Sequence, residues 1–202
     1  MPITSERGAN RRSRHRKKER RMTLTQYFAT PETLVPQEVV FGGFRAADAP
    51  FSMHQRVVAR LFVALHDHVE PRALGEVWLA PLDVILDPDE HAPLVVQPDL
   101  CFIARENAAI VRERVWGPPD LVIEVLSPRP RIGELAERLV WFATYGVREC
   151  WLVQQSTQQL DVVRFDERRI AGQRTFERND RIESAVLPAF ERTLDGILRG
   201  RE

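Results

Sequence analysis

Two acidic residues interrupt the apolar runs in the middle of the chain. Asp99 stands in VVQPDLCFI and Glu124 in DLVIEVL, and both runs have the composition of buried β-strands. A bare carboxylate is costly to bury, so a chain that places two of them in core strands pairs them with a cation or gives them a metal ion. These two positions therefore constrain both the fold and the chemistry.

The spacing of the acidic residues indicates which of them can act together. Asp120 and Glu124 share one face of the same strand but lie roughly 13 Å apart at about 3.3 Å per residue. One metal ion needs carboxylate oxygens about 2.0–2.6 Å away. Asp99, on a neighbouring antiparallel strand, can approach Glu124 to within about 5 Å, which predicts an Asp99–Glu124 site for Mg²⁺. The alternative is that Asp99 caps a turn after Pro98 and Glu124 forms a buried ion pair with an arginine.

Hydrophobic periodicity predicts a mixed α/β (α+β) fold built around a central sheet with helices packed on it. Helices are expected from an N-cap at Thr23, from an N-cap at Ser52, over 131–145 and from about 187 to 198. Strands are expected at 38–41, 44–46, 76–86, 94–103, 120–126, 150–153 and 160–165, and near 173–177.

Charge is unevenly distributed along the 202 residues. Residues 1–21 hold nine Lys or Arg and two Glu, a net charge of +7, and because the whole chain is neutral the remainder carries −7. The basic segment is interpreted either as a disordered nucleic-acid-binding tail or as sequence upstream of the true start at Met22. Residues 22–202 are expected to form a single domain. No apolar run approaches about 18 residues, so we expect no membrane span and a cytoplasmic protein.

Several motifs in the middle of the chain form a recognisable set: Pro98-Asp99, PDLVIEVLSP, the helix after it and YGVRECWLV. Together they resemble the Uma-two family, a branch of the PD-(D/E)XK nuclease superfamily. The likeness extends over about residues 22–198 through MTLTQYFATPE, QEVVFGG, PFSMHQRVVARL and SAVLPAFERTLDGIL. It implies a restriction-endonuclease-like fold, with a central mixed β-sheet flanked by helices. It also implies Mg²⁺- or Mn²⁺-dependent endonuclease (hydrolase) activity on DNA.

The resemblance implies site residues position by position. Asp99 and Glu124 would be the metal carboxylates, with Glu38 as a further acidic ligand; the alternative for Glu38 is a solvent-facing strand residue. The family's Asp and Lys in the helix after the Ser-Pro turn are replaced by Glu134 and Arg138. Their i, i+4 spacing is also that of an ordinary surface ion pair.

The missing lysine bears on activity. The only lysines of the chain are Lys17 and Lys18, so residues 22–202 contain none. Arginine can stabilise negative charge on a phosphate but stays protonated and is a poor base. The sequence therefore predicts a metal-dependent endonuclease with Arg138 in the lysine position. The alternative is a catalytically impaired relative that binds nucleic acid or protein.

Three further residues are weaker candidates. His54, at the start of a helix, is expected either at the edge of the site or as a capping and packing residue. Arg129 and Arg131 follow a strand end and are interpreted either as phosphate contacts or as solvated side chains. A homodimer is a third hypothesis, since nucleases that act on two strands often pair.

Overall fold

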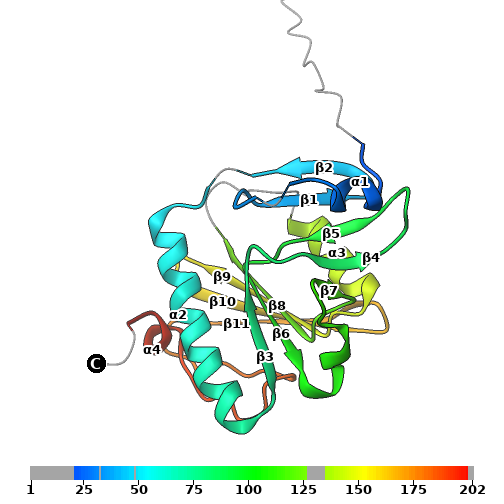
Figure 1. The fold of residues 1–202 in the computed structure, drawn as a ribbon. Helices are drawn as coiled ribbons and strands as arrows, with labels where there is room; N and C mark the ends of the chain where they lie inside the picture. Colours follow the sequence, from blue (N-terminus) through cyan, green and yellow to red (C-terminus); the bar gives the residue numbers. More distant parts are fainter. Residues whose placement is uncertain (1–20, 32, 48, 127–134, 200–202) are drawn as a thin grey trace, which may run out of the picture.

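A computed structural model describes residues 21–31, 33–47, 49–126 and 135–199 (Figure 1). Its larger sheet has six strands in the order β11-β10-β9-β8-β6-β3 and is mixed, because β8 and β9 run parallel while the other neighbours are antiparallel. These strands are β3 (Gly75–Leu79), β6 (Leu100–Ala104), β8 (Leu121–Leu126), β9 (Glu149–Gln154), β10 (Gln159–Asp166) and β11 (Arg169–Phe176).

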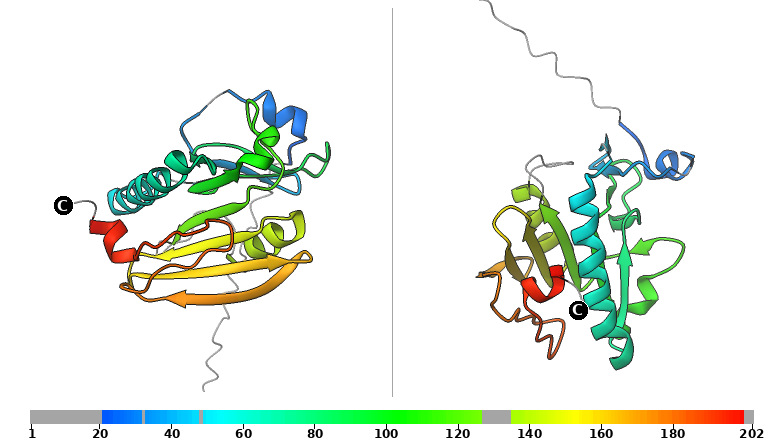
Figure 2. Two further views of the ribbon diagram at one scale, coloured as in Figure 1. Left: turned by 90° about the horizontal axis from the view of Figure 1, so that it is seen from below. Right: turned by 90° about the vertical axis from the view of Figure 1, so that its left-hand side faces the viewer.

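The smaller sheet has five strands in the order β2-β1-β5-β4-β7, in which only β4 and β7 pair in parallel. Its strands are β1 (Gln37–Val40), β2 (Gly43–Ala46), β4 (Val84–Asp87), β5 (Leu94–Val96) and β7 (Val115–Trp116). Short 3₁₀ helices at Glu70–Arg72 and Arg105–Ile110 complete the connections. In the left view of Figure 2 this sheet and the outer strands β9–β11 lie in separate layers.

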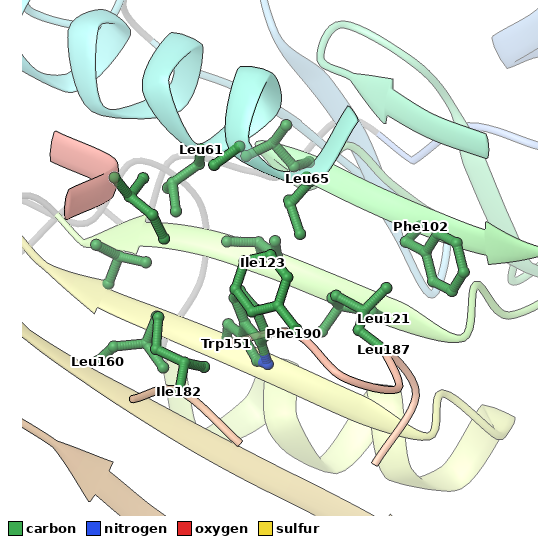
Figure 3. Close-up of a cluster of buried hydrophobic side chains, with 14 of the residues drawn as sticks. Leu61, Leu65, Phe102, Leu121, Ile123, Trp151, Leu160, Ile182, Leu187 and Phe190 are labelled. Atoms are coloured by element: carbon green, nitrogen blue, oxygen red, sulfur yellow. The ribbon is translucent and has the colours of Figure 1, made fainter. Parts of the chain in front are cut away.

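Two helices cover one face of the six-stranded sheet. They are α2 (Ser52–Val69) and α4 (Leu194–Arg199), which lie in contact with each other (Figure 2). Leu61 and Leu65 point from α2 toward Ile123 on β8 and Trp151 on β9 (Figure 3). All four side chains are fully buried, so this apolar layer fixes β8 in the centre of the molecule.

The opposite face of the six-stranded sheet packs against α3 (Leu135–Tyr145) and the five-stranded sheet. Phe142 of α3 shares this second core with Val122 of β8 and Val96 of β5. The short helix α1 (Leu24–Phe28) packs on the outer side of the five-stranded sheet. One end of β8 therefore lies where both sheets and α3 meet.

The predicted α+β class, with a central mixed sheet flanked by helices, is confirmed. The second sheet was not predicted. The sequence predicts one strand over 76–86 and one over 94–103, and both predictions are wrong. Each stretch divides between the two sheets, at Pro81 and at Pro98. Proline has no N–H to donate to a ladder, so the chain leaves one sheet there and joins the other.

The last predicted helix is also shorter than expected. Leu187 and Phe190 are buried in the core from an irregular segment, and α4 begins only at Leu194. Ala189 between them has φ +57°, a left-handed conformation that no α-helix contains. For the helix expected over 131–145 the structure gives Leu135–Tyr145, and its predicted start lies outside the described residues.

Candidate active site

The antiparallel pairing of β6 with β8 brings the two candidate carboxylates together. Leu100 pairs with Ile123, so Asp99 and Glu124 lie one residue further, at the same end of the ladder. Asp120 lies at the other end of β8. Its carboxylate accepts hydrogen bonds from Ala104 N–H at 2.8 Å and from Arg148 Nη1 at 2.9 Å. Asp120 thus has a structural role remote from the pair.

Arg138 joins Glu124 to Glu38. Its Nη1 donates to both oxygens of Glu38 at 2.9 Å, and its Nε and Nη2 donate to Oε1 of Glu124 at 3.0 and 2.5 Å. Glu38 is fully buried and Arg138 is only 6% exposed. The solvent-facing interpretation of Glu38 and the surface-pair interpretation of Arg138 are therefore wrong. The alternative of a buried ion pair between Glu124 and an arginine is present in the structure.

The electrostatics of the cluster are dominated by buried negative charge. Burial raises the pKa of Glu124 to about 7, although Arg138 lowers it; Asp99 and Glu38 raise it further. Burial disfavours the charged guanidinium of Arg138, but Glu124 and Glu38 outweigh this effect and raise its pKa. Among the described residues, Arg138 thus bonds both Glu38 and Glu124, and the raised pKa of Glu124 shows that its charged form is only partly compensated.

His54, on α2, hydrogen-bonds to the Asp99 carboxylate. Its Nε2 lies 3.1 Å from Oδ2 of Asp99, and the same oxygen accepts the Val125 N–H at 2.8 Å. The carboxylate accepts, so Nε2 carries the proton; Nδ1 is buried with no hydrogen-bond partner among the described residues. The helix-capping interpretation of His54 is wrong, because the side chain is 2% exposed and faces Asp99.

A cavity of about 320 Å³ reaches Asp99 from the side of α2 and the end of β3. Its wall is mostly apolar and includes Val58, Phe62 and Pro81. Asp99 therefore lies at the boundary between the buried cluster and a space that a ligand can enter.

Glu134, Arg129 and Arg131 lie outside the described residues. One contributor was missed by the sequence analysis: the backbone N–H of Gln97 donates to Oε1 of Glu38 at 2.8 Å. A backbone N–H donor has no side-chain pattern in the sequence, so the sequence could not identify this contact.

The donor set fits a hard divalent cation only in part. Carboxylate oxygens suit Mg²⁺ or Mn²⁺. The described residues donate hydrogen bonds to Oε1 of Glu124 but not to its Oε2, which leaves Oε2 for an ion. Across the described part of the chain, however, no three His, Cys, Asp or Glu side chains are grouped to hold a metal. Mg²⁺ commonly takes only one or two carboxylates and completes its shell with water and phosphate oxygens, so Asp99 with Glu124 is sufficient.

Comparison with known families decides the relationship. The model of the Uma2 family, described as "Putative restriction endonuclease", matches residues 24–195. The chain belongs to the Uma2 family. The family description supports a nuclease for this Uma2 protein.

Solved structures agree at the level of the fold. A protein from Anabaena variabilis ATCC 29413, described as a "putative nuclease belonging to DUF820", superposes with a TM-score of 0.72 at 17% identity. The match covers 88% of the Uma2 chain and 98% of the other. A search of curated proteins finds no match. Among the described helices of the Uma2 protein, none has the length and apolar character needed to cross a bilayer.

Proposed function

We propose that this Uma2 protein is a metal-dependent endonuclease that hydrolyses phosphodiester bonds of DNA at the Asp99–Glu124 pair. The observation that carries the proposal is the placement of two carboxylates at one end of β8, with Asp99 lining a cavity and the pKa of Glu124 raised to about 7. Strongly perturbed pKa values cluster at functional sites, where they accompany a cleft and neighbouring charged groups.

Asp99 and Glu124 would hold Mg²⁺ or Mn²⁺, which when bound supplies Lewis-acid polarisation of a phosphate and acidifies a water molecule. His54 and the Val125 N–H fix the orientation of Asp99 through its Oδ2. Arg138 fixes Glu124 and keeps a permanent positive charge next to the site. Because arginine does not give up its proton, it positions and stabilises charge but does not act as the base.

The remaining sequence predictions extend this proposal. Arg129 and Arg131 are proposed phosphate contacts, and Glu134 is proposed as a supporting acidic residue. A homodimer that acts on both strands and a cytoplasmic location stay predictions. So does a single domain that begins near Met22, with residues 1–21 as a basic tail or a mis-assigned start.

A catalytically impaired relative that binds nucleic acid or protein is the second candidate. Two observations favour it: Arg138 already bonds to both Glu38 and Glu124, and residues 22–202 contain no lysine. In this alternative the protein has lost the ability to cleave nucleic acid, and the buried ion pairs of Arg138 serve only to stabilise the fold.

Cleavage of labelled single- and double-stranded DNA with Mg²⁺ or Mn²⁺ tests the proposal. We expect Asp99→Ala and Glu124→Ala to lower the rate more than about 100-fold, since losing a residue that only hydrogen-bonds to a metal ligand already costs about 10–100-fold. The exposed Glu167→Gln is the matched control and should cleave like the parent chain. Circular dichroism and thermal unfolding check that each variant is folded.

The outcomes separate the two candidates. Cleavage by Asp99→Ala at the parent rate would show that the site assignment is wrong. No cleavage by the parent with either metal favours the binding protein. In that case, cleavage by Arg138→Lys would show that the arginine is what suppresses activity.

A further inference from the structure

Both oxygens of the Glu38 carboxylate accept hydrogen bonds. Arg138 Nη1 donates to both of its oxygens at 2.9 Å, and the Gln97 N–H donates to Oε1 at 2.8 Å. The side chain is completely buried, so water does not reach it. A metal ion could bind Glu38 only after displacing the guanidinium.

The guanidinium of Arg138 also occupies the space between two carboxylates. Nη1 faces Glu38, while Nε and Nη2 face Oε1 of Glu124. A metal ion that bridged Glu38 and Glu124 would have to lie where the guanidinium now lies. A divalent ion placed there as well would be repelled by the fixed charge of the arginine.

The other side of Glu124 differs. Its Oε2 accepts no hydrogen bond from the described residues, and Asp99 lies opposite Glu124 across the ladder and lines the cavity. Glu38 does not line the cavity, so an ion that enters from it meets Asp99 first.

We propose that Arg138 is a built-in cation that takes the place of a second metal ion. The site then binds one divalent ion, held by Asp99 and Glu124, and Glu38 is not one of its ligands. This inference rests on the proposed metal-dependent function and replaces the sequence-based assignment of Glu38 to the metal. Arg138 is on this account a positioning residue.

Mn²⁺ binding to the full chain without DNA tests the inference, with free ion measured by electron paramagnetic resonance. We expect one Mn²⁺ per chain. Glu38→Gln should keep this stoichiometry and leave Kd within twofold, because Arg138 still bonds the amide oxygen. The exposed Glu76→Gln on β3 controls for weak surface binding. If Glu38 were a ligand, its loss would weaken binding at least tenfold.

Arg138→Met supplies the complementary variant. Without the guanidinium, Glu38 and Glu124 can take an ion, so we expect two Mn²⁺ per chain, and one again in the Glu38→Gln/Arg138→Met double variant. Leaving Glu38 buried without its partner is destabilising. If Arg138→Met does not fold, Glu38→Gln alone decides the question.

The failures are distinguishable. Two ions on the parent, tenfold weaker binding by Glu38→Gln, or a single ion on folded Arg138→Met would each overturn the one-ion inference and leave the proposed nuclease function standing. No Mn²⁺ on the parent, with or without DNA, overturns the proposed metal-dependent function, and the inference with it.

Discussion

A comparison of two glutamates explains why Glu124 stands out as a site residue. Glu149 on β9 is fully buried, whereas the Glu124 side chain is 14% exposed. The Glu149 carboxylate accepts hydrogen bonds from Trp151 Nε1 at 2.7 Å, Ser184 Oγ at 2.6 Å and the Ala185 N–H at 2.8 Å. Neutral donors satisfy both of its oxygens. Burial alone therefore does not mark a functional carboxylate; an incomplete set of partners does.

Glu149→Gln is predicted to lower the free energy of unfolding by about 2–4 kcal/mol. The amide would turn an N–H₂ group toward donors that now bond to an ionised carboxylate, and hydrogen bonds to charged groups contribute about 1.5–3 kcal/mol each. Urea unfolding measures the change. The control is Glu167→Gln, which should alter stability by less than about 0.5 kcal/mol; equal losses in the two variants would contradict the structural role of Glu149.

Residue spacing predicts part of the site. Side-chain alternation and antiparallel pairing are local rules, so the approach of Asp99 to Glu124 follows from the sequence. The hydrogen bond between Arg138 and Glu38 does not follow from the sequence, because the two residues are 100 positions apart. Arg138 lies on α3 and Glu38 on β1, in the five-stranded sheet rather than in the sheet that holds Glu124. Which arginine meets which carboxylate depends on how the two sheets pack, and a single sequence does not encode that in any local pattern.

At the scale of elements, local hydrogen-bonding chemistry is predicted better than sheet membership. Thr23 caps α1 as expected, with its Oγ1 accepting the Gln26 N–H at 3.1 Å. Ser52 is instead the first residue of α2, and Phe51 holds the cap position without a side-chain bond. The run 94–103 reads as one strand because both halves are buried, and apolar composition does not distinguish one core from two.

Gly75 is the element-scale position most sensitive to substitution. It starts β3 with φ +154°, and a Cβ there would overlap the carbonyl oxygen of Ile103 and lie 2.9 Å from Cα of Ala104. Because these are backbone atoms of the paired strand β6, they cannot move aside. We predict that Gly75→Ala lowers the free energy of unfolding by roughly 3 kcal/mol.

The matched control is Gly172→Ala on β11, where the added methyl group meets only the Arg164 side chain at 3.7 Å. Its stability should change by less than about 1 kcal/mol. Chemical denaturation of both variants measures the difference. A Gly75→Ala protein as stable as Gly172→Ala would show that β3 and β6 are not paired as described.

For the whole molecule, His68 links stability to pH. Burial lowers its pKa below the ordinary value of 6.5, and Arg72 lowers it further, although its hydrogen bond to the Pro188 carbonyl opposes the shift. The unfolded chain therefore binds a proton at a higher pH than the folded protein. The contribution of His68 to stability is constant above about pH 6.5 and falls as the pH drops below this value toward the lowered folded-state pKa, by up to about 1.4 kcal/mol per pH unit.

His68→Gln should reduce the loss of stability below pH 6.5, because glutamine can still donate to the Pro188 carbonyl but does not titrate. Urea midpoints of the parent and the variant, measured between about pH 5 and pH 7.5, supply the comparison. Parallel curves would mean that other groups cause the acid sensitivity.

The distance along the chain between Glu38 and Arg138 has a consequence during protein synthesis. Ribosomes add about 5–20 residues each second, so Arg138 is made roughly 5–20 s after the carboxylate that it neutralises, 100 residues earlier. Until then Glu38 has no cation to accompany it into the interior, and β1 cannot settle in its final place. A half-made chain therefore has no assembled Glu38–Arg138–Glu124 cluster until α3 has been synthesised.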